Sequence, residues 1–254
     1  MAPPTLILQV AHPIVGAGVT RHSNFTAEPW TRLIRTLLSV NRIVFAPAAT
    51  AQAESQRLRR LHATIRGTDD AGRAYHALDP GAYAWVHLTL VHLFVEVQRV
   101  FGQPLTRAQE ELLYHEWRHV GRLLHVEEKR MPGDWDAFRW YFDDMVEHTL
   151  ESNRAVGDVL ASVAHPKKPL SVLPAAAWEP VAGRAGNLSI LFAAGTLPAR
   201  LRERIGLPWT AEDQARLEQH GRRLRAAFSV VPRPLLTLPP AMPYLVRARL
   251  AALR

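Results

Sequence analysis

Residues 28–66 read EPWTRLIRTLLSVNRIVFAPAATAQAESQRLRRLHATIR, and this stretch indicates two helices in succession. Pro29 is typical of the first position of a helix, and apolar residues then recur at helical spacing as far as Phe45. Residues 49–66, which are rich in alanine and arginine, predict a second helix closed by Gly67. No alternation of apolar and polar residues indicates a pair of strands, so we expect an all-α fold.

Cap signals predict further helices along the rest of the chain. In chain order these are a helix over 80–101 between Asp79 and Gly102, one from the capping box of Thr106 and Gln109 to about Leu124, one long helix over 135–163, short helices near 183–194 and 198–205, and one over 210–228. The clearest change in composition is HPKKP at 165–169. We therefore expect one compact helical domain, with a core region over 1–165 and a proline-punctuated extension over 166–254 packed on it.

The composition bounds the chemistry that this chain can perform. It has 254 residues, 48% of them hydrophobic and 21% charged, which is enough apolar material for a sizeable core. It has no cysteine, which excludes disulfides, cysteine-ligated zinc, iron–sulfur clusters and cysteine nucleophiles. Any metal or cofactor must then be held by the 12 histidines, the carboxylates or other oxygen donors.

The chain is basic, with a formal net charge of +8. Of its 31 basic residues 28 are arginines, a bias that we attribute mostly to GC-rich coding. The arginine cluster at 222–225 is typical of a solvated helix face, and no nucleic-acid partner is expected. Residues 1–10 lack a basic signal-peptide start, and the apolar stretch 83–101 carries His87, His92 and Glu96. We therefore expect a cytoplasmic protein without a membrane span.

Four polar residues share one narrow face of the helix over 30–45, although apolar residues cover most of its circumference. They lie at positions i, i+3, i+4 and i+7, namely Arg32, Arg35, Thr36 and Ser39. We expect this helix to be buried, and a buried arginine needs an anionic or strongly hydrogen-bonding partner. Either carboxylates such as Glu28 or Asp69 supply that partner, or the stripe lines a functional pocket.

The second candidate is a histidine on the apolar face of the following helix. Leu58, His62 and Ile65 lie at i, i+4 and i+7, so the imidazole of His62 points with the apolar residues. Taken alone, this pattern is typical of a hydrogen-bonded core histidine. A neutral imidazole in an apolar pocket is also the proximal ligand that haem iron uses.

Two further histidine patterns are present. Residues 115–119 read HEWRH, the HExxH pattern of zinc peptidases, in which His115 and His119 would bind zinc and Glu116 would act as general base. The charged residues around this motif are instead typical of a solvated face. His87 lies near Trp85 in an apolar stretch, and this pattern predicts that His87 occupies the core or lines a cofactor pocket.

Several short motifs follow one another in a particular order. They are Leu8-Gln9-Val10-Ala11-His12-Pro13, Gly18-Val19, His22-Ser23, Phe25, Pro29, Arg32-Leu33-Ile34-Arg35-Thr36, Leu61-His62-Ala63, Arg66-Gly67, Tyr75, Ala77, Asp79-Pro80, Trp85-Val86-His87, Phe101-Gly102, Leu105-Thr106 and Leu123-Leu124. In this order they resemble the DUF2236 family, also called the MpaB-type or rubber-oxygenase catalytic domain. The resemblance covers residues 6–160 well and the rest loosely.

The resemblance implies globin-like packing of helices around a b-type haem. It implies His62 as the proximal iron ligand and Arg32, Arg35 and Thr36 at the distal positions. Rubber-cleaving members of the family carry lysine where this chain has Arg35. Lysine can lose its proton and bind iron, whereas arginine keeps its proton. A lysine-capped iron is therefore not expected here, and rubber is not the expected substrate.

Our leading hypothesis is a haem b-dependent oxygenase. It would activate dioxygen on an iron ligated by His62 and act on a small apolar substrate, isoprenoid-like or unsaturated. The catalytic residues would be Arg32, Arg35 and Thr36, and the same three residues with His62 and His87 would bind the cofactor. The alternatives are a helical haem or lipid-like ligand carrier without turnover, and a zinc metallopeptidase that uses His115, Glu116 and His119.

Overall fold

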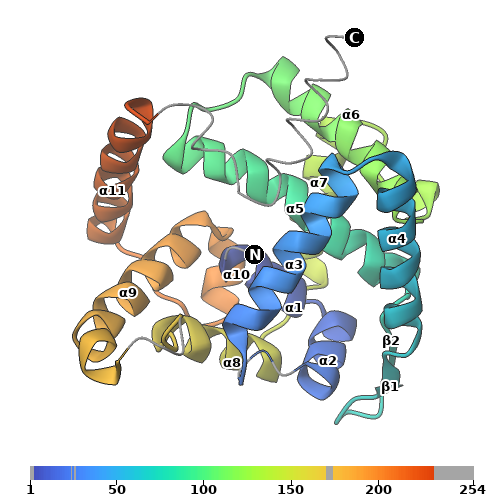
Figure 1. The fold of residues 1–254 in the computed structure, drawn as a ribbon, viewed down its shortest axis with the longest axis horizontal. Helices are drawn as coiled ribbons and strands as arrows, with labels where there is room; N and C mark the ends of the chain where they lie inside the picture. Colours follow the sequence, from blue (N-terminus) through green and yellow to red (C-terminus); the bar gives the residue numbers. More distant parts are fainter. Residues whose placement is uncertain (1–2, 24, 26, 170–173, 232–254) are drawn as a thin grey trace.

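In this computed structural model the described residues are 3–23, 25, 27–169 and 174–231. They form an all-α fold, as predicted, together with one small hairpin that was not predicted (Figure 1). The helices are α1 (Pro3–Val10), α2 (Pro13–His22), α3 (Pro29–Phe45), α4 (Ala48–Ala63), α5 (Pro80–Phe101), α6 (Arg107–Leu123), α7 (Trp135–His148), α8 (Arg154–Ala164), α9 (Ala175–Thr196), α10 (Ala199–Arg204) and α11 (Ala211–Ser229), with a 3-10 turn at Glu128–Arg130 and strands β1 (Arg66–Thr68) and β2 (Ala74–His76).

The core lies where the short helix α1 meets the long helix α5. The indole Nε1 of Trp85, which is fully buried, donates to the carbonyl oxygen of Leu8 over 2.9 Å. Gln9 reaches the hydroxyl of Thr89 over 3.0 Å. Because Gln9 satisfies its amide inside the core, α1 can be buried almost completely although it carries a polar side chain.

Several predicted helix boundaries are confirmed, and local capping explains them. The Asp79 side chain accepts a hydrogen bond from the backbone N–H of Ala82 at the start of α5, which ends before Gly102. Thr106 and Gln109 form the predicted capping box of α6. Each cap satisfies backbone groups that the first turn of a helix leaves without partners.

The prediction of one long helix over 135–163 is wrong, because the chain breaks it into α7 and α8. Between them the backbone N–H of Glu151 donates to the carbonyl oxygen of Ala11 over 2.9 Å. The Asn153 side chain donates to the carbonyl of Val10 and accepts from the N–H of Val156, which caps α8. The turn is therefore held by α1, a partner some 140 residues away in the sequence.

The second predicted helix, over 49–66, ends earlier than expected. The chain then forms a pair of short strands, although none was predicted. Helix α4 stops at Ala63, and β1 pairs antiparallel with β2 so that Gly67 lies opposite Tyr75. A Cβ at residue 67 would lie 2.7 Å from the Tyr75 hydroxyl oxygen. Gly67 thus serves the close approach of a tyrosine instead of a helix end.

The chain after the break at 165–169 is helical and contacts the earlier helices. Arg204 of α10 donates to the carbonyl oxygen of Val146 over 2.6 Å, and Arg225 of α11 donates to that of Val100 over 2.7 Å. Helix α9 is longer than the predicted short helix, and the prolines from 232 onward lie outside the described residues. None of the helices described here is long and apolar enough to cross a membrane.

The prediction that the helix over 30–45 is buried is wrong for one of its sides. Ser39, Asn41 and Ile43 are buried, whereas 56% of Ile34 and 42% of Phe45 are exposed. The main helical neighbour of α3 is α4. Because α3 packs along the side that carries Ser39, the opposite apolar side faces outward.

Candidate functional site

Helices α3 and α4 meet at one end and diverge toward the other, like the arms of a V (Figure 1). At the closed end Ser39 of α3 donates a hydrogen bond to Glu54 of α4 over 2.5 Å. Arg57 donates to the same carboxylate over 3.0 and 2.6 Å, and Arg42 lies 3.5 Å from it. Hydrogen bonds from Arg57 and then Ser39 lower the pKa of Glu54 to about 2, so this buried carboxylate is charged at neutral pH.

The α3 arm carries an arginine without a carboxylate partner. Toward the open end, the side of α3 that carries Ser39 continues to Arg35 and Arg32, four and seven residues earlier. The guanidinium of Arg32 is half-buried, and its Cζ lies 5.7 Å from the centre of the Phe25 ring. Burial lowers the pKa of Arg32, and none of the described carboxylates forms an ion pair with it. A half-buried cation of this kind indicates a place for an anionic or electron-rich ligand.

The carboxylates proposed from the sequence as partners of this stripe do not pair with it. Glu28 is exposed and forms no ion pair with a described residue. Asp69 instead pairs with Arg73 at 2.7 Å. The alternative in which these two acids neutralise the stripe is therefore not realised in the described part of the chain.

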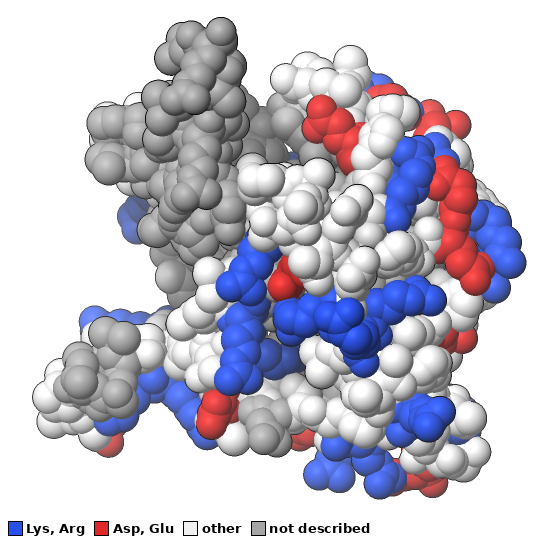
Figure 2. Space-filling model, turned by 45° about the vertical axis from the view of Figure 1, so that its right-hand side comes forward, with Lys and Arg blue, Asp and Glu red and all other residues white. Residues whose placement is uncertain are grey.

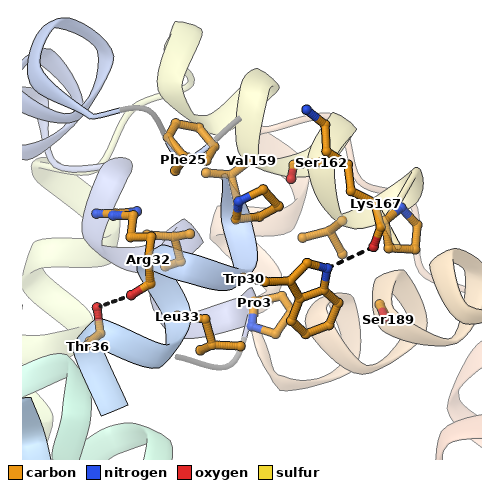
Figure 3. A pocket seen from close by; sticks show the side chains of 14 residues that line it. Pro3, Phe25, Trp30, Arg32, Leu33, Thr36, Val159, Ser162, Lys167 and Ser189 are labelled. Atoms are coloured by element: carbon orange, nitrogen blue, oxygen red, sulfur yellow. Dashed lines mark hydrogen bonds between the residues drawn. The ribbon is translucent and has the colours of Figure 1, made fainter. Parts of the chain in front are cut away.

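Arg32 and Thr36 line a cavity of about 170 Å³ (Figure 3). Apolar side chains form most of its walls, among them Pro3, Leu6, Phe25, Trp30, Leu33, Val159 and Val163. The Thr36 hydroxyl donates to the carbonyl oxygen of Arg32 over 3.0 Å and so stays beside it. Arg35 is exposed and does not line the cavity. The structure therefore brings Arg32 and Thr36 together in one cavity and leaves Arg35 outside it.

His62 lies on the α4 arm of the V. The side of α4 that carries Glu54 also carries Leu58 and Leu61, four and seven residues later. His62 is the next residue after Leu61. The imidazole packs edge-on against Tyr83, with ring centres 5.7 Å apart, and its buried Nδ1 has no hydrogen-bond partner among the described residues. Burial is the main cause of the lowered pKa of His62, so the ring is neutral at pH 7. It is not among the residues that line the cavity with Arg32.

His87 lies in the core between α5 and α6. Its ring stacks on Trp117 with centres 5.2 Å apart, and its Nε2 lies 3.1 Å from the Trp117 carbonyl oxygen. Burial lowers the pKa of His87 to about 4. These contacts match the predicted core position, and His87 is not part of the Arg32 cavity.

The HExxH motif lies on the surface of α6. His115, Glu116 and His119 are exposed, and the Arg122 guanidinium lies 2.7 Å from Nδ1 of His119. Across the described ranges no group of three or more histidine, aspartate or glutamate side chains is arranged to hold a metal ion. A neighbouring guanidinium also opposes a bound cation, so the geometry does not favour the zinc-peptidase alternative.

The sequence did not single out a second cavity, of about 490 Å³, between α5, α7 and the α9–α10 junction. His92 lines it, stacks on Phe142 with ring centres 4.1 Å apart, and has a pKa lowered to about 4, chiefly by burial. The five-residue spacing of His87 and His92 predicts different faces, and the two rings do contact different helices.

The family of the chain is shown by its match to a protein-family model. Residues 1–227 match the family model described as ER-bound oxygenase mpaB/B'/Rubber oxygenase, catalytic domain. The chain belongs to this family. The resemblance drawn from the N-terminal motifs is thereby confirmed, and membership in the mpaB/rubber-oxygenase family supports an oxygenase reaction with a substrate and dioxygen.

Two curated relatives in mycobacteria are similar to this member of the mpaB/rubber-oxygenase family. They are the uncharacterized protein Rv2237 of Mycobacterium tuberculosis and the uncharacterized protein Mb2261 of Mycobacterium bovis. Each is 27% identical over 237 residues, which covers 89% of this chain and 87% of the relative. No solved structure matches the chain significantly.

Proposed function

We propose that this protein is a haem b-dependent oxygenase that acts on a small apolar substrate, isoprenoid-like or unsaturated. One relationship carries the proposal. Two groups lie on the two arms of one V: the neutral imidazole of His62 on α4, whose Nδ1 has no hydrogen-bond partner among the described residues, and the half-buried guanidinium of Arg32 on α3, which pairs with no described carboxylate. Family membership supports the oxygenase part of the proposal.

The residues on the α4 arm fit a haem. An axial histidine must be neutral, and burial keeps His62 in that form. Leu61 beside it is 50% exposed, and a flat apolar ring is the kind of surface that would cover such a side chain. His62 would hold the iron. That His87 also binds the cofactor remains a prediction from the sequence.

Arginines near the open end of the V fit the acidic groups of that cofactor. Arg35, Arg59, Arg60 and Arg66 are exposed, and no ion pair joins any of them to a described carboxylate. Figure 2 shows lysine and arginine side chains gathered across the middle of the face on which α4 lies. Guanidinium groups bind carboxylates through paired hydrogen bonds, so these arginines would meet the two propionates.

The side chains of the cavity have separate tasks in the proposed reaction. Haem iron supplies the binding and activation of dioxygen. Arg32 stays protonated at neutral pH and would donate hydrogen bonds to an oxygen that gains negative charge. The hydroxyl of Thr36, held beside Arg32, would orient a water or pass a proton. The apolar walls at Trp30 and Leu33 would hold an unsaturated chain and exclude bulk water. Arg35 cannot lose its proton to act as an iron ligand.

A spectrum of the purified protein tests the cofactor. We expect a Soret band and a pyridine haemochrome of type b, after addition of haemin if the purified protein is colourless. His62→Ala should lose the haem, whereas His115→Ala, which removes an exposed histidine of α6, should retain it. A wild-type protein that binds no haemin, or an unchanged occupancy in His62→Ala, would contradict the proposal.

Oxygen consumption separates the oxygenase from a carrier. The haem-loaded protein should consume dioxygen in the presence of short polyprenyl substrates. A protein that binds haem and the apolar ligand but consumes no oxygen would instead be a ligand carrier that uses the same cavity without turnover.

A further inference from the structure

We propose that the substrate of the Arg32 cavity is an amphipathic anion, an unsaturated apolar chain that ends in a carboxylate or phosphate held at Lys167. This inference rests on the proposed function, because it takes the same cavity as the substrate site. It adds a head group to a substrate that the proposed function defines only as apolar.

The charge of the cavity lining is the first argument. Its walls are mainly apolar, but Arg32 and Lys167 are both among the lining residues, and no carboxylate is found among the described side chains that line it. An apolar cavity with two cations and no acid is complementary to a ligand that is apolar along most of its length and negatively charged at one point. A wholly apolar ligand would leave the Lys167 ammonium without an anionic group to bind.

The positions of the two cations assign them different tasks. Figure 3 shows the side chains of Arg32 and Thr36 on one side of the cavity and Lys167 on the other, with Trp30 and Leu33 between them. Arg32 is half-buried, whereas Lys167 is exposed. A ligand would therefore enter with its apolar chain leading, so that its unsaturated carbons lie near Arg32 and its head group stays at Lys167.

Lys167 is anchored but keeps free donors. The Trp30 indole donates to the carbonyl oxygen of Lys167 over 2.8 Å, which ties this backbone to α3. The ammonium Nζ donates to the carbonyl oxygen of Ala27 over 3.1 Å. An ammonium group has three N–H donors, so two stay available for an anionic oxygen. Within the described part of the chain Lys167 forms no ion pair, and the hydroxyls of Ser162 and Ser189 line the same region.

The choice of residue supports the same conclusion. Only three of the 31 basic residues are lysines, and Lys167 is one of them. A coding bias toward arginine does not account for a lysine at the edge of this cavity. A lysine ammonium on a flexible stem suits a head group that must enter and leave, because it can follow the group over several positions.

Equilibrium binding to the purified protein without added haem tests this inference. The probes are geranic acid, geranyl monophosphate and geraniol, which share one short unsaturated chain, measured by isothermal titration calorimetry below the micellar concentration. We expect each anion to bind about tenfold more tightly than the alcohol. The stronger of geranic acid and geranyl monophosphate then shows whether the head group is a carboxylate or a phosphate.

Two charge-reversed variants show where the head group lies. Lys167→Glu should weaken binding of the anions by about tenfold or more and leave binding of the alcohol unchanged. Lys129→Glu makes the same change at an exposed lysine of the 3-10 turn and should leave all ligands unchanged. Far-ultraviolet circular dichroism should confirm that both variants are folded.

Three outcomes would overturn the inference, and none depends on haem. They are equal affinity for anion and alcohol, an equal effect of Lys129→Glu, and binding of neither class. A protein that binds geranic acid or geranyl monophosphate through Lys167 but never binds haemin would refute the oxygenase and leave an anionic ligand site. A haem-loaded oxygenase that binds only the alcohol would keep the proposed function and refute the head group.

Discussion

Ser39 of α3 and Glu54 of α4 are joined by a buried hydrogen bond of 2.5 Å, and this bond links the arm that carries Arg32 to the arm that carries His62. The carboxylate also accepts from Arg57 on its own helix. Because both arms depend on one buried charge, we infer that Glu54 sets the relative position of the two arms.

Glu54 should make the stability of the protein depend on pH in the acid range. Its pKa is lowered to about 2 in the folded protein from its ordinary value of 4.5, so its contribution is complete above pH 4.5 and is lost as the pH falls toward 2. We expect Glu54→Gln to lower the free energy of unfolding by about 2 kcal/mol at pH 7 and by much less at pH 3. Urea unfolding at both pH values measures this, with exposed Glu116→Gln as the control. An equal loss at both pH values would refute it.

His62 should matter for the cofactor and little for the fold. Its buried Nδ1 makes no hydrogen bond to a described residue, so His62→Ala should change the free energy of unfolding of the haem-free protein by about 1 kcal/mol or less. His87→Ala should cost about 3 kcal/mol, since that ring is stacked on Trp117 and hydrogen-bonded. Thermal unfolding compares the two variants. A larger loss in His62→Ala than in His87→Ala would show that His62 is a structural residue.

Arg32 should contribute to activity at the expense of stability. Replacing a half-buried guanidinium that has no described carboxylate partner with a similar apolar side chain relieves a desolvation cost. We expect Arg32→Met to be as stable as the wild type or up to about 1 kcal/mol more stable. Its oxygen consumption should fall on the order of a hundredfold. Arg154→Met, at an exposed arginine of α8, should keep full activity. A stable Arg32→Met variant with full activity would remove Arg32 from the reaction.

Gly186 should be required for the packing of α9 on α8. A Cβ at this position would collide with the carbonyl oxygen of Ala164, which is backbone and cannot turn away. We expect Gly186→Ala to cost about 2 kcal/mol. Gly183→Ala in the same helix meets no atom within 4 Å and should stabilise by about 1 kcal/mol. Chemical unfolding of the two variants measures the contrast, and a neutral Gly186→Ala would mean that the two helices separate easily.

Helix boundaries were the part of the fold that local sequence predicted well. Pro29, Asp79 and Thr106 each mark the start of a helix where expected, because a first-turn proline or a side-chain cap acts within one turn of itself. Helical spacing decides which residues share a side of a helix. The sequence therefore also predicted that Arg32 and Thr36 share one side of α3 and that His62 lies with apolar residues.

Features that depend on distant partners could not be read in this way. The turn between α7 and α8 depends on backbone groups of α1, and the end of α4 depends on the pairing of Gly67 with Tyr75. The sequence alone determined where several helices begin, the lack of thiol chemistry and the residue types at the site. Only the tertiary structure decided that Arg32 has no described acid beside it, that Arg35 lies outside the cavity, and that Lys167 lies at its edge. Helix propensity and capping act over a few residues, whereas burial and ion pairing depend on which distant side chains the fold brings together.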